Sequence, residues 1–150
     1  MKILICDKLD KLTLEELQKI GNCIDVSEEK NKKEKVIENI VDAEIVLVRS
    51  DTQINKELID TSENLKIIGR SGVGTDNIDL VEASERNIYV TNTPEANVIS
   101  AAELTVGLII AAARNITGAN NSVKKNEWER SQFMGIELHK KQLGLIGFGK

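Results

Sequence analysis

Short apolar runs alternate with amphipathic stretches over the first 98 residues of the chain. The runs are rich in Ile, Val and Leu, which is typical of strands buried on both faces. They predict strands at 2–6, 23–26, 43–48, 65–69 and 87–92. The stretches between them repeat apolar residues at helical spacing and predict helices at 13–20, 30–41, 55–61 and 79–86. Strands separated by helices indicate a doubly wound, parallel α/β unit with right-handed crossovers.

Two sequences of the form Ser/Thr-x-x-Glu predict where helices begin. Thr13 with Glu16, and Ser100 with Glu103, each match a capping box, in which the first residue caps the helix. Gly21 is expected just past the end of the first helix, where glycine is favoured.

The pattern changes near residue 97. A long apolar helix is predicted over 99–115, and small residues along it allow another backbone to approach closely. Such a helix is either a core helix of one domain or a surface shared with a second subunit. Residues 117–141 are polar, and 142–149 predict a strand that runs into glycines.

Composition excludes several classes of protein. The chain has 150 residues and a formal net charge of −4, so it has no overall basic field for nucleic acid or a membrane surface. No apolar run reaches the roughly 18 residues of a membrane span, and the first residues predict a strand, so we expect a cytoplasmic protein. Cys6 and Cys23 are expected to be reduced thiols, with a disulfide as the alternative. Two cysteines and one histidine cannot by themselves complete a structural zinc site, so no metal is expected.

Candidate binding residues follow the predicted strands. In an open parallel sheet, ligands bind outside the carboxyl ends of the strands. Arg49 follows the third strand, and Arg70 with the glycines of 72–74 follows the fourth. Arginine forks suit carboxylate or phosphate, and a glycine-rich turn can present its amides as an anion nest. This edge therefore predicts a site for a small, multiply anionic ligand, although surface ion pairs and a plain turn remain the alternatives.

The end of the chain offers a weaker signal. Gly147 and Gly149 follow an apolar run, as in the first half of G-x-G-x-x-G, the fingerprint that holds a dinucleotide pyrophosphate. A plain glycine turn is the alternative. His139 is expected at the surface, and no nucleophile–base arrangement is readable, so no catalytic residue is predicted in the chain.

Four segments together resemble one family. IIGRSGVGTDNIDL (67–80), NTPEANVISAAELTVGLIIAAAR (92–114), WERSQFMGIEL (128–138) and LGLIGFGK (143–150) are similar to the D-isomer-specific 2-hydroxyacid dehydrogenases. The third segment, together with Arg49-Ser50, resembles the phosphoglycerate branch. The resemblance implies a flavodoxin-like substrate domain over 1–98. It also implies that 99–150 is the truncated start of an NAD-binding Rossmann domain, with a dimerisation helix, an arm and a first strand.

The resemblance also implies an activity and a set of site residues. The activity is NAD-linked oxidation of 3-phosphoglycerate to 3-phosphohydroxypyruvate, at the entry to serine biosynthesis, by a protein that is at least a homodimer. The substrate positions are Arg49, Arg70, Gly72, Val73, Gly74, Asn97 and Arg130, the last reaching a neighbouring subunit's substrate phosphate. The cofactor positions are Val73, Gly147, Gly149 and Lys150. Glu129 is acidic where some relatives carry a second basic residue, which leaves Arg130 as the expected phosphate contact.

In the family, the catalytic histidine, its glutamate and the arginine that holds the substrate carboxylate lie in a later portion, and His139 does not match that histidine. We therefore expect these 150 residues alone to be inactive. Three alternatives remain. They are another D-2-hydroxyacid dehydrogenase of the glyoxylate, hydroxypyruvate or lactate type, a non-catalytic α/β binding module, and a truncated paralogue that only dimerises.

Overall fold

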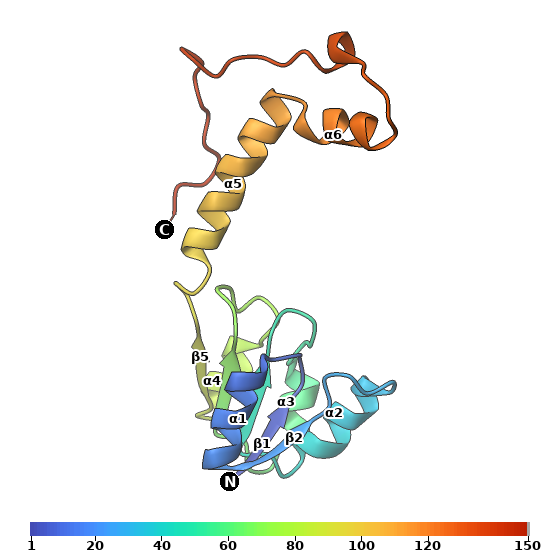
Figure 1. Cartoon of the computed structure of the whole chain (residues 1–150). Helices are drawn as coiled ribbons and strands as arrows, with labels where there is room; N and C mark the ends of the chain where they lie inside the picture. The colour runs from blue at the N-terminus through green and yellow to red at the C-terminus, as the bar shows by residue number, and fades with distance from the viewer. Residues whose placement is uncertain (150) are drawn as a thin grey trace. The chain divides into compact units, whose positions relative to one another are not determined.

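The computed structural model describes residues 1–149, which form two compact units. The first unit, Met1–Ala96, alternates strands and helices in the predicted order (Figure 1). Its elements are β1 (Lys2–Ile5), α1 (Lys11–Ile20), β2 (Asn22–Asp25), α2 (Lys32–Ile40), β3 (Ile45–Val48), α3 (Lys56–Thr61), β4 (Ile67–Arg70), α4 (Leu80–Glu85) and β5 (Tyr89–Asn92). All five predicted strands and all four predicted helices of this unit are confirmed, with ends shifted by a few residues.

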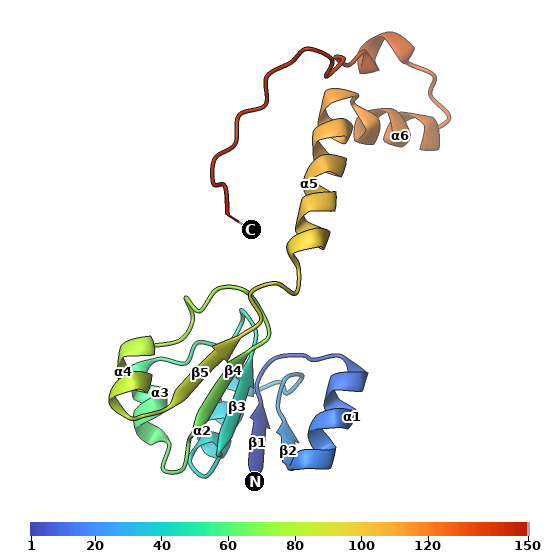
Figure 2. The same ribbon diagram turned by 90° about the vertical axis from the view of Figure 1, so that its left-hand side faces the viewer.

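The five strands form one parallel sheet in the order β2-β1-β3-β4-β5 (Figure 2). This is the flavodoxin-like order, and the predicted doubly wound α/β fold is therefore confirmed. Because every strand runs in the same direction, all five carboxyl ends meet at one edge of the sheet. The order reverses between β1 and β3, and a crevice is expected beside that point.

The main core lies between the sheet and α2, α3 and α4. Strand side chains on this face pack in one cluster with Ile40 of α2, Ile59 of α3 and Ala83 of α4. These residues are Leu4, Val46, Val48 and Ile68 of the strands, with Cys6 directly after β1. Right-handed crossovers place α1 alone on the other face. None of the residues of α1 is buried.

The two predicted N-cap residues are wrong, whereas Gly21 follows the last residue of α1 as predicted. Asp10, not Thr13, caps α1: its carboxylate accepts the amide of Thr13 at 3.0 Å, and an aspartate serves here as well as a threonine. Gly21 is extended, with φ −167°, and it is needed for close packing because a Cβ there would lie 2.8 Å from the carbonyl oxygen of Met1. Ser100 lies inside α5, whose N-cap residue is Asn97.

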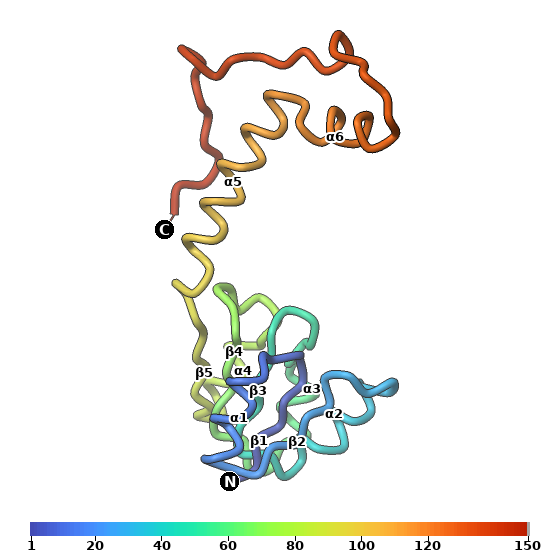
Figure 3. Tube along the Cα trace, in the orientation of Figure 1, coloured from blue at the N-terminus to red at the C-terminus, as the bar shows by residue number. Residues whose placement is uncertain are grey.

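The second unit begins at Asn97 and contains α5 (Val98–Ala113), α6 (Ile116–Lys124) and the short 3₁₀ helix η1 (Arg130–Phe133). Figure 3 traces the chain through these elements into an extended end segment. The strand predicted at 142–149 is not formed. A strand needs neighbours for its backbone groups, and this segment has none among residues 1–149, so Leu143, Leu145 and Ile146 stay exposed.

None of the helices within residues 1–149 is by itself long and apolar enough to cross a membrane. The bent pair of α5 and α6, with 68° between them, reaches that length and composition only when taken together.

The fold predicts a large stability effect at the centre of the sheet. Ile68 of β4 is fully buried in the main core, so Ile68→Ala should lower the free energy of unfolding by about 2–5 kcal/mol through lost burial and a residual cavity. Urea denaturation followed by circular dichroism measures the change. Ile37→Ala is the matched control, since Ile37 on α2 is 45% exposed and should lose far less. Equal losses would contradict the proposed core.

Candidate functional site

A cleft of about 620 Å³ opens at the carboxyl edge of the sheet. It is lined by residues of the β1–α1 segment and by the ends of β3, β4 and β5. The lining residues are Lys8, Leu9, Asp10, Thr13, Leu17, Leu47, Val48, Arg49, Gly69, Arg70, Ser71, Thr91, Asn92 and Thr93. The structure thus brings Arg49 and Arg70 into one cleft, as expected from the ends of their strands. Their role in binding a ligand stays a prediction.

The buried carboxylate of Asp7 anchors the loop that carries Arg49. It lies at the end of β1, is 2% exposed, and accepts the backbone amide of Arg49 at 2.6 Å. Thr52 donates its amide at 3.2 Å and its hydroxyl at 2.7 Å. Lys32 of α2 completes the set with an ion pair of 2.5 Å. These four contacts tie β1, α2 and the β3–α3 loop together.

Asn77 holds the same loop from the opposite side. It is 2% exposed, and its side-chain amide donates to the carbonyl of Arg49 at 2.8 Å and to that of Thr52 at 2.6 Å. Both backbone polar groups of Arg49 are therefore fixed, one by Asp7 and one by Asn77. The guanidinium stays exposed, with a single long contact of 3.5 Å from Nη1 to the carbonyl of Lys8. No carboxylate among residues 1–149 forms an ion pair with Arg49. The alternative that Arg49 forms a surface ion pair therefore does not hold.

Arg70 is held more tightly than Arg49. Its side chain is 10% exposed, and Nη1 donates to Asp76 Oδ1 at 2.7 Å. This hydrogen bond lowers the pKa of the Asp76 carboxyl. The Nε of Arg70 is buried without a hydrogen-bond partner in the described chain. The ion-pair alternative thus holds for Arg70, and part of its donor capacity remains unused beside the cleft.

The glycine-rich loop after β4 was expected to present its amides as an anion nest, and this role stays a prediction. Neither Gly72 nor Gly74 has a positive φ, and the amide of Gly72 already donates to the carbonyl of Arg70. Gly74 instead gives room to the arginine, because a Cβ there would lie 2.7 Å from Asp76 Oδ1 and 3.2 Å from Arg70 Nη1.

The chain after β5 holds the other side of this loop. Asn92 donates its side-chain amide to the carbonyl of Val73 at 2.6 Å. Thr93 donates its backbone amide to the carbonyl of Gly72 at 3.0 Å. The side chain of Val73 is 46% exposed. The loop is therefore fixed through its carbonyl groups, and Val73 stays accessible to a ligand.

The remaining predicted site residues belong to the second unit. Asn97 precedes α5 and makes no side-chain cap hydrogen bond, and Arg130 is the first residue of η1. Gly147 has φ +88°, a conformation that favours glycine, and no atom would lie within 4 Å of a Cβ at Gly147 or Gly149. Lys150 lies outside the described residues. The roles of these residues stay predictions.

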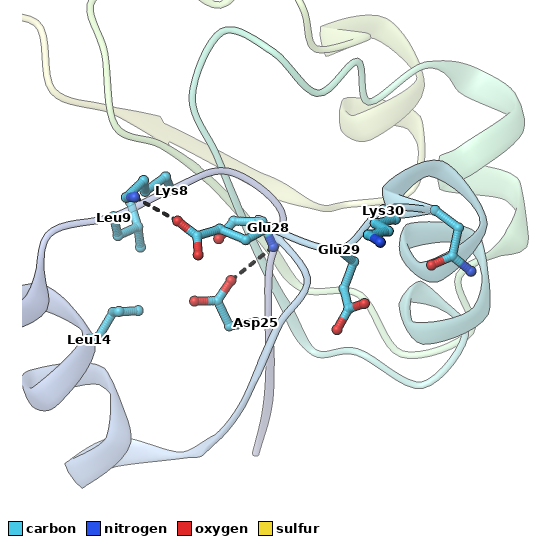
Figure 4. Close-up of a pocket in the computed structure, with 9 residues that line it drawn as sticks. Lys8, Leu9, Leu14, Asp25, Glu28, Glu29 and Lys30 are labelled. Atoms are coloured by element: carbon cyan, nitrogen blue, oxygen red, sulfur yellow. Dashed lines mark hydrogen bonds and ion pairs between the residues drawn. The ribbon is translucent and has the colours of Figure 1, made fainter.

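A second cavity, of about 740 Å³, lies beside the ends of β1 and β2 (Figure 4). Lys8 also lines this cavity, and its Nζ pairs with Glu28 at 2.6 Å. Asp25 accepts the amide of Ser27 at 2.9 Å. Acidic and basic side chains are mixed in this cavity. No arginine lines it, whereas two arginines line the cleft at the ends of β3 and β4.

The cysteines and the histidine provide no further chemistry. Cys6 and Cys23 are both free, as expected. Burial and the neighbouring charge of Asp7 raise the pKa of Cys6 to about 12, so its thiol stays protonated and unreactive. His139 is exposed. Within residues 1–149, no group of three or more His, Cys, Asp or Glu side chains could hold a metal ion.

Comparison with known proteins points to one family. The family model described as "D-isomer specific 2-hydroxyacid dehydrogenase, catalytic domain" matches residues 3–140. The D-3-phosphoglycerate dehydrogenase of Methanocaldococcus jannaschii is 47% identical over the whole chain, which spans 28% of that relative's length. A solved NAD⁺-bound 3-phosphoglycerate dehydrogenase of Entamoeba histolytica is 36% identical with a TM-score of 0.62, over 76% of this chain and 39% of that one. The solved structure of the TT0316 protein of Thermus thermophilus has a TM-score of 0.83 at 26% identity, over 92% of this chain and 46% of that one.

The contacts of Asp7 predict a pH dependence of stability. Burial alone would raise its pKa, but hydrogen bonds from Lys32, Thr52 and Arg49 leave the pKa below its ordinary value. A carboxylate with a lowered folded-state pKa stabilises the fold above its unfolded pKa of about 4, and this contribution is lost as the pH falls through the folded-state value. Asp7→Asn should lower the free energy of unfolding at pH 7 by about 1–3 kcal/mol.

The difference between the two proteins should shrink as the pH falls below about 4, because the carboxyl is then protonated first in the unfolded chain and, below its lowered folded-state pKa, in the folded protein too. Urea unfolding at a series of pH values measures this. Asp51→Asn is the control, since Asp51 is an exposed carboxylate of the same loop. A difference that stays constant down to a pH of about 2 would contradict the assignment.

Proposed function

Because the chain belongs to the D-isomer specific 2-hydroxyacid dehydrogenase family, we propose that it is the amino-terminal part of an NAD-dependent oxidoreductase that oxidises 3-phospho-D-glycerate to 3-phosphohydroxypyruvate, the first step of L-serine biosynthesis. The observation that carries this proposal is the cleft with Arg49 and Arg70 at the carboxyl edge of the sheet. The substrate carries a carboxylate and a phosphate, and the two arginines offer bidentate donors for such groups. The phosphoglycerate dehydrogenases among its relatives support the choice of substrate.

In this proposal the present chain binds and orients the substrate. Arg49 extends an exposed guanidinium from a loop that Asp7 and Asn77 hold on both sides. Arg70 brings a second cation with an unused Nε, and the exposed loop 72–74 faces the carboxylate with Val73 toward the cofactor. Asn97 adds a polar contact, and Arg130 of a second subunit reaches the phosphate. The protein is therefore proposed to be at least a homodimer, and its two free thiols support a cytoplasmic location.

The nicotinamide cofactor would be held at the end of the chain. Gly147, with its positive φ, and Gly149, with open space around it, fit the opening of the G-x-G-x-x-G fingerprint. Lys150 is the next residue of that fingerprint in the sequence. NAD, when bound, supplies a hydride acceptor for the C2 hydrogen of the substrate. The residues of this chain hold the anionic ends of the substrate, so that its C2 atom is presented in a fixed orientation.

A second candidate is a D-2-hydroxyacid dehydrogenase for an acid without phosphate. The Arg70–Asp76 ion pair favours it, because an arginine already paired has less capacity for a further anion. Arg130 separates the two candidates, since only a phosphorylated substrate needs a cation beyond those that receive the carboxylate.

We therefore expect that Arg130→Ala in the full-length enzyme raises KM for 3-phosphoglycerate by on the order of 10-fold or more, through the loss of a charge-assisted contact. The KM for a 2-hydroxy acid without phosphate should not change. Steady-state kinetics with both substrates measure this, and Lys124→Ala, which removes an exposed cation at the end of α6, is the control. An unchanged KM for 3-phosphoglycerate would favour the second candidate.

The purified 150-residue chain is expected to be inactive. Its one histidine is His139, which the family resemblance does not match to the catalytic base. Absorbance at the NADH band after mixing the chain with NAD and 3-phosphoglycerate measures turnover, with the full-length enzyme as the positive control. NADH formation above the rate without protein would show that the chain carries its own base.

A further inference from the structure

One cation, Lys32, lies close to the cleft that contains Arg49 and Arg70 but does not line it. Lys32 is on α2, and its Nζ reaches Asp7 Oδ1 at 2.5 Å. The lysine side chain is 28% exposed and the aspartate 2%. Lys32 instead lines a separate groove of about 570 Å³, together with Val36 and Leu58, on the face of the sheet covered by α2 and α3. It therefore approaches Asp7 from the side away from the cleft.

The charge of Asp7 is a problem for a site that binds anions. Its carboxylate lies one hydrogen bond, 2.6 Å, from the amide of Arg49, the residue whose guanidinium is proposed to receive the substrate. The amides of Arg49 and Thr52 and the hydroxyl of Thr52 are neutral donors, so they stabilise the negative charge without cancelling it. In the part of the chain that the structure describes, Lys32 is the one side chain that forms an ion pair with Asp7. A charge buried near a ligand is screened little by solvent.

We propose that Lys32 sets the affinity of the cleft for its anionic substrate by neutralising Asp7 from the opposite face of the sheet. Lys32 is a positioning residue, because it acts through Asp7 and does not touch the ligand. The proposal rests on the proposed function only in requiring an anionic substrate at Arg49, which any 2-hydroxy acid would be at neutral pH.

Lys32 affects the charge at Asp7, whereas the neutral donors hold the loop in place. Without Lys32, Asp7 keeps its three neutral donors, so the loop that carries Arg49 keeps its anchors while the carboxylate charge is uncovered. That charge repels the substrate before and during the reaction alike, so KM should rise while kcat stays unchanged. Removing both charges together should restore binding. In Asp7→Asn, the amide oxygen can still accept the amides of Arg49 and Thr52.

The experiment compares four variants of the full-length protein. Lys32→Met should raise both KM and the calorimetric Kd for 3-phosphoglycerate by about 3- to 10-fold, as expected for one uncovered charge several ångströms from the ligand. Lys32→Arg should stay within about twofold of the wild type, because it keeps the charge. The double variant Asp7→Asn/Lys32→Met should recover most of the loss. Lys33→Met removes the neighbouring lysine, which lines the same groove and forms no ion pair within residues 1–149, and should change nothing.

Three results would overturn the proposal: an unchanged Kd in Lys32→Met, a double variant as weak as Lys32→Met, or an equal loss in Lys33→Met. If Lys32→Met does not fold, as judged by circular dichroism, the Kd of Asp7→Asn for 3-phosphoglycerate tests the proposal instead. It should tighten binding because it removes the anion and keeps the lysine, and a weaker Kd would refute the idea. A wild type that binds 3-phosphoglycerate without turnover refutes the proposed function, and the Kd ratios still test Lys32. A wild type that binds no 2-hydroxy acid refutes both.

Discussion

The cleft depends on one buried carboxylate. Asp7 sits where β1 ends and accepts four hydrogen bonds or ion-pair contacts from α2 and the β3–α3 loop. A buried carboxylate without such partners would be costly, so these partners must stay in place whenever the fold is formed. The position of Arg49 is therefore a consequence of satisfying Asp7.

This arrangement explains how a chain with a net charge of −4 can present an anion site. A ligand responds to the local field, and three of the carboxylates near the cleft are each paired with a cation, while Asp10, which lines the cleft, accepts the amide and the hydroxyl of Thr13. Asp7 is paired with Lys32, Asp76 with Arg70, and Glu28 with Lys8. Of the two arginines in the cleft, Arg49 is the one that extends a charge without an ion-pair partner among residues 1–149. The net charge of the chain excluded a broad basic surface and carried no information on this one position.

The sequence predicted the sheet well because its signal is strong and local. Each strand is a short apolar run, and the order of the elements leaves few right-handed topologies. The placing of Arg49 and Arg70 on one edge followed from that topology alone. Helix caps were predicted less well, since Asp10 and Thr13 both suit an N-cap and only the chain's path decides between them.

The supports of the site were missed for a different reason. Asp7 and Asn77 act through contacts with residues 42 and 28 positions away along the chain, Arg49 being the partner of both. No local pattern reveals such pairs. The available signal was the character of the residues: an aspartate directly after a buried strand, and an asparagine inside a glycine-rich turn, are both polar groups at positions that the fold buries. Asking where each would find its hydrogen bonds could have pointed to the β3–α3 loop.

The second unit also contains groups that find no partner among the described residues. In α5, Leu104, Val106, Leu108 and Ile110 are all exposed, and none of its residues is buried. A helix that is apolar on all sides is stable in water only when other protein surface covers it. The segment after α6 reaches one end of α5, where the backbone of Gly135 lies against Ala113, while Phe133 lies against Gly118 of α6. The 142–149 segment has a strand sequence and no strand to pair with among the described residues. A second subunit, as in the homodimer proposed above, would supply apolar surface for α5.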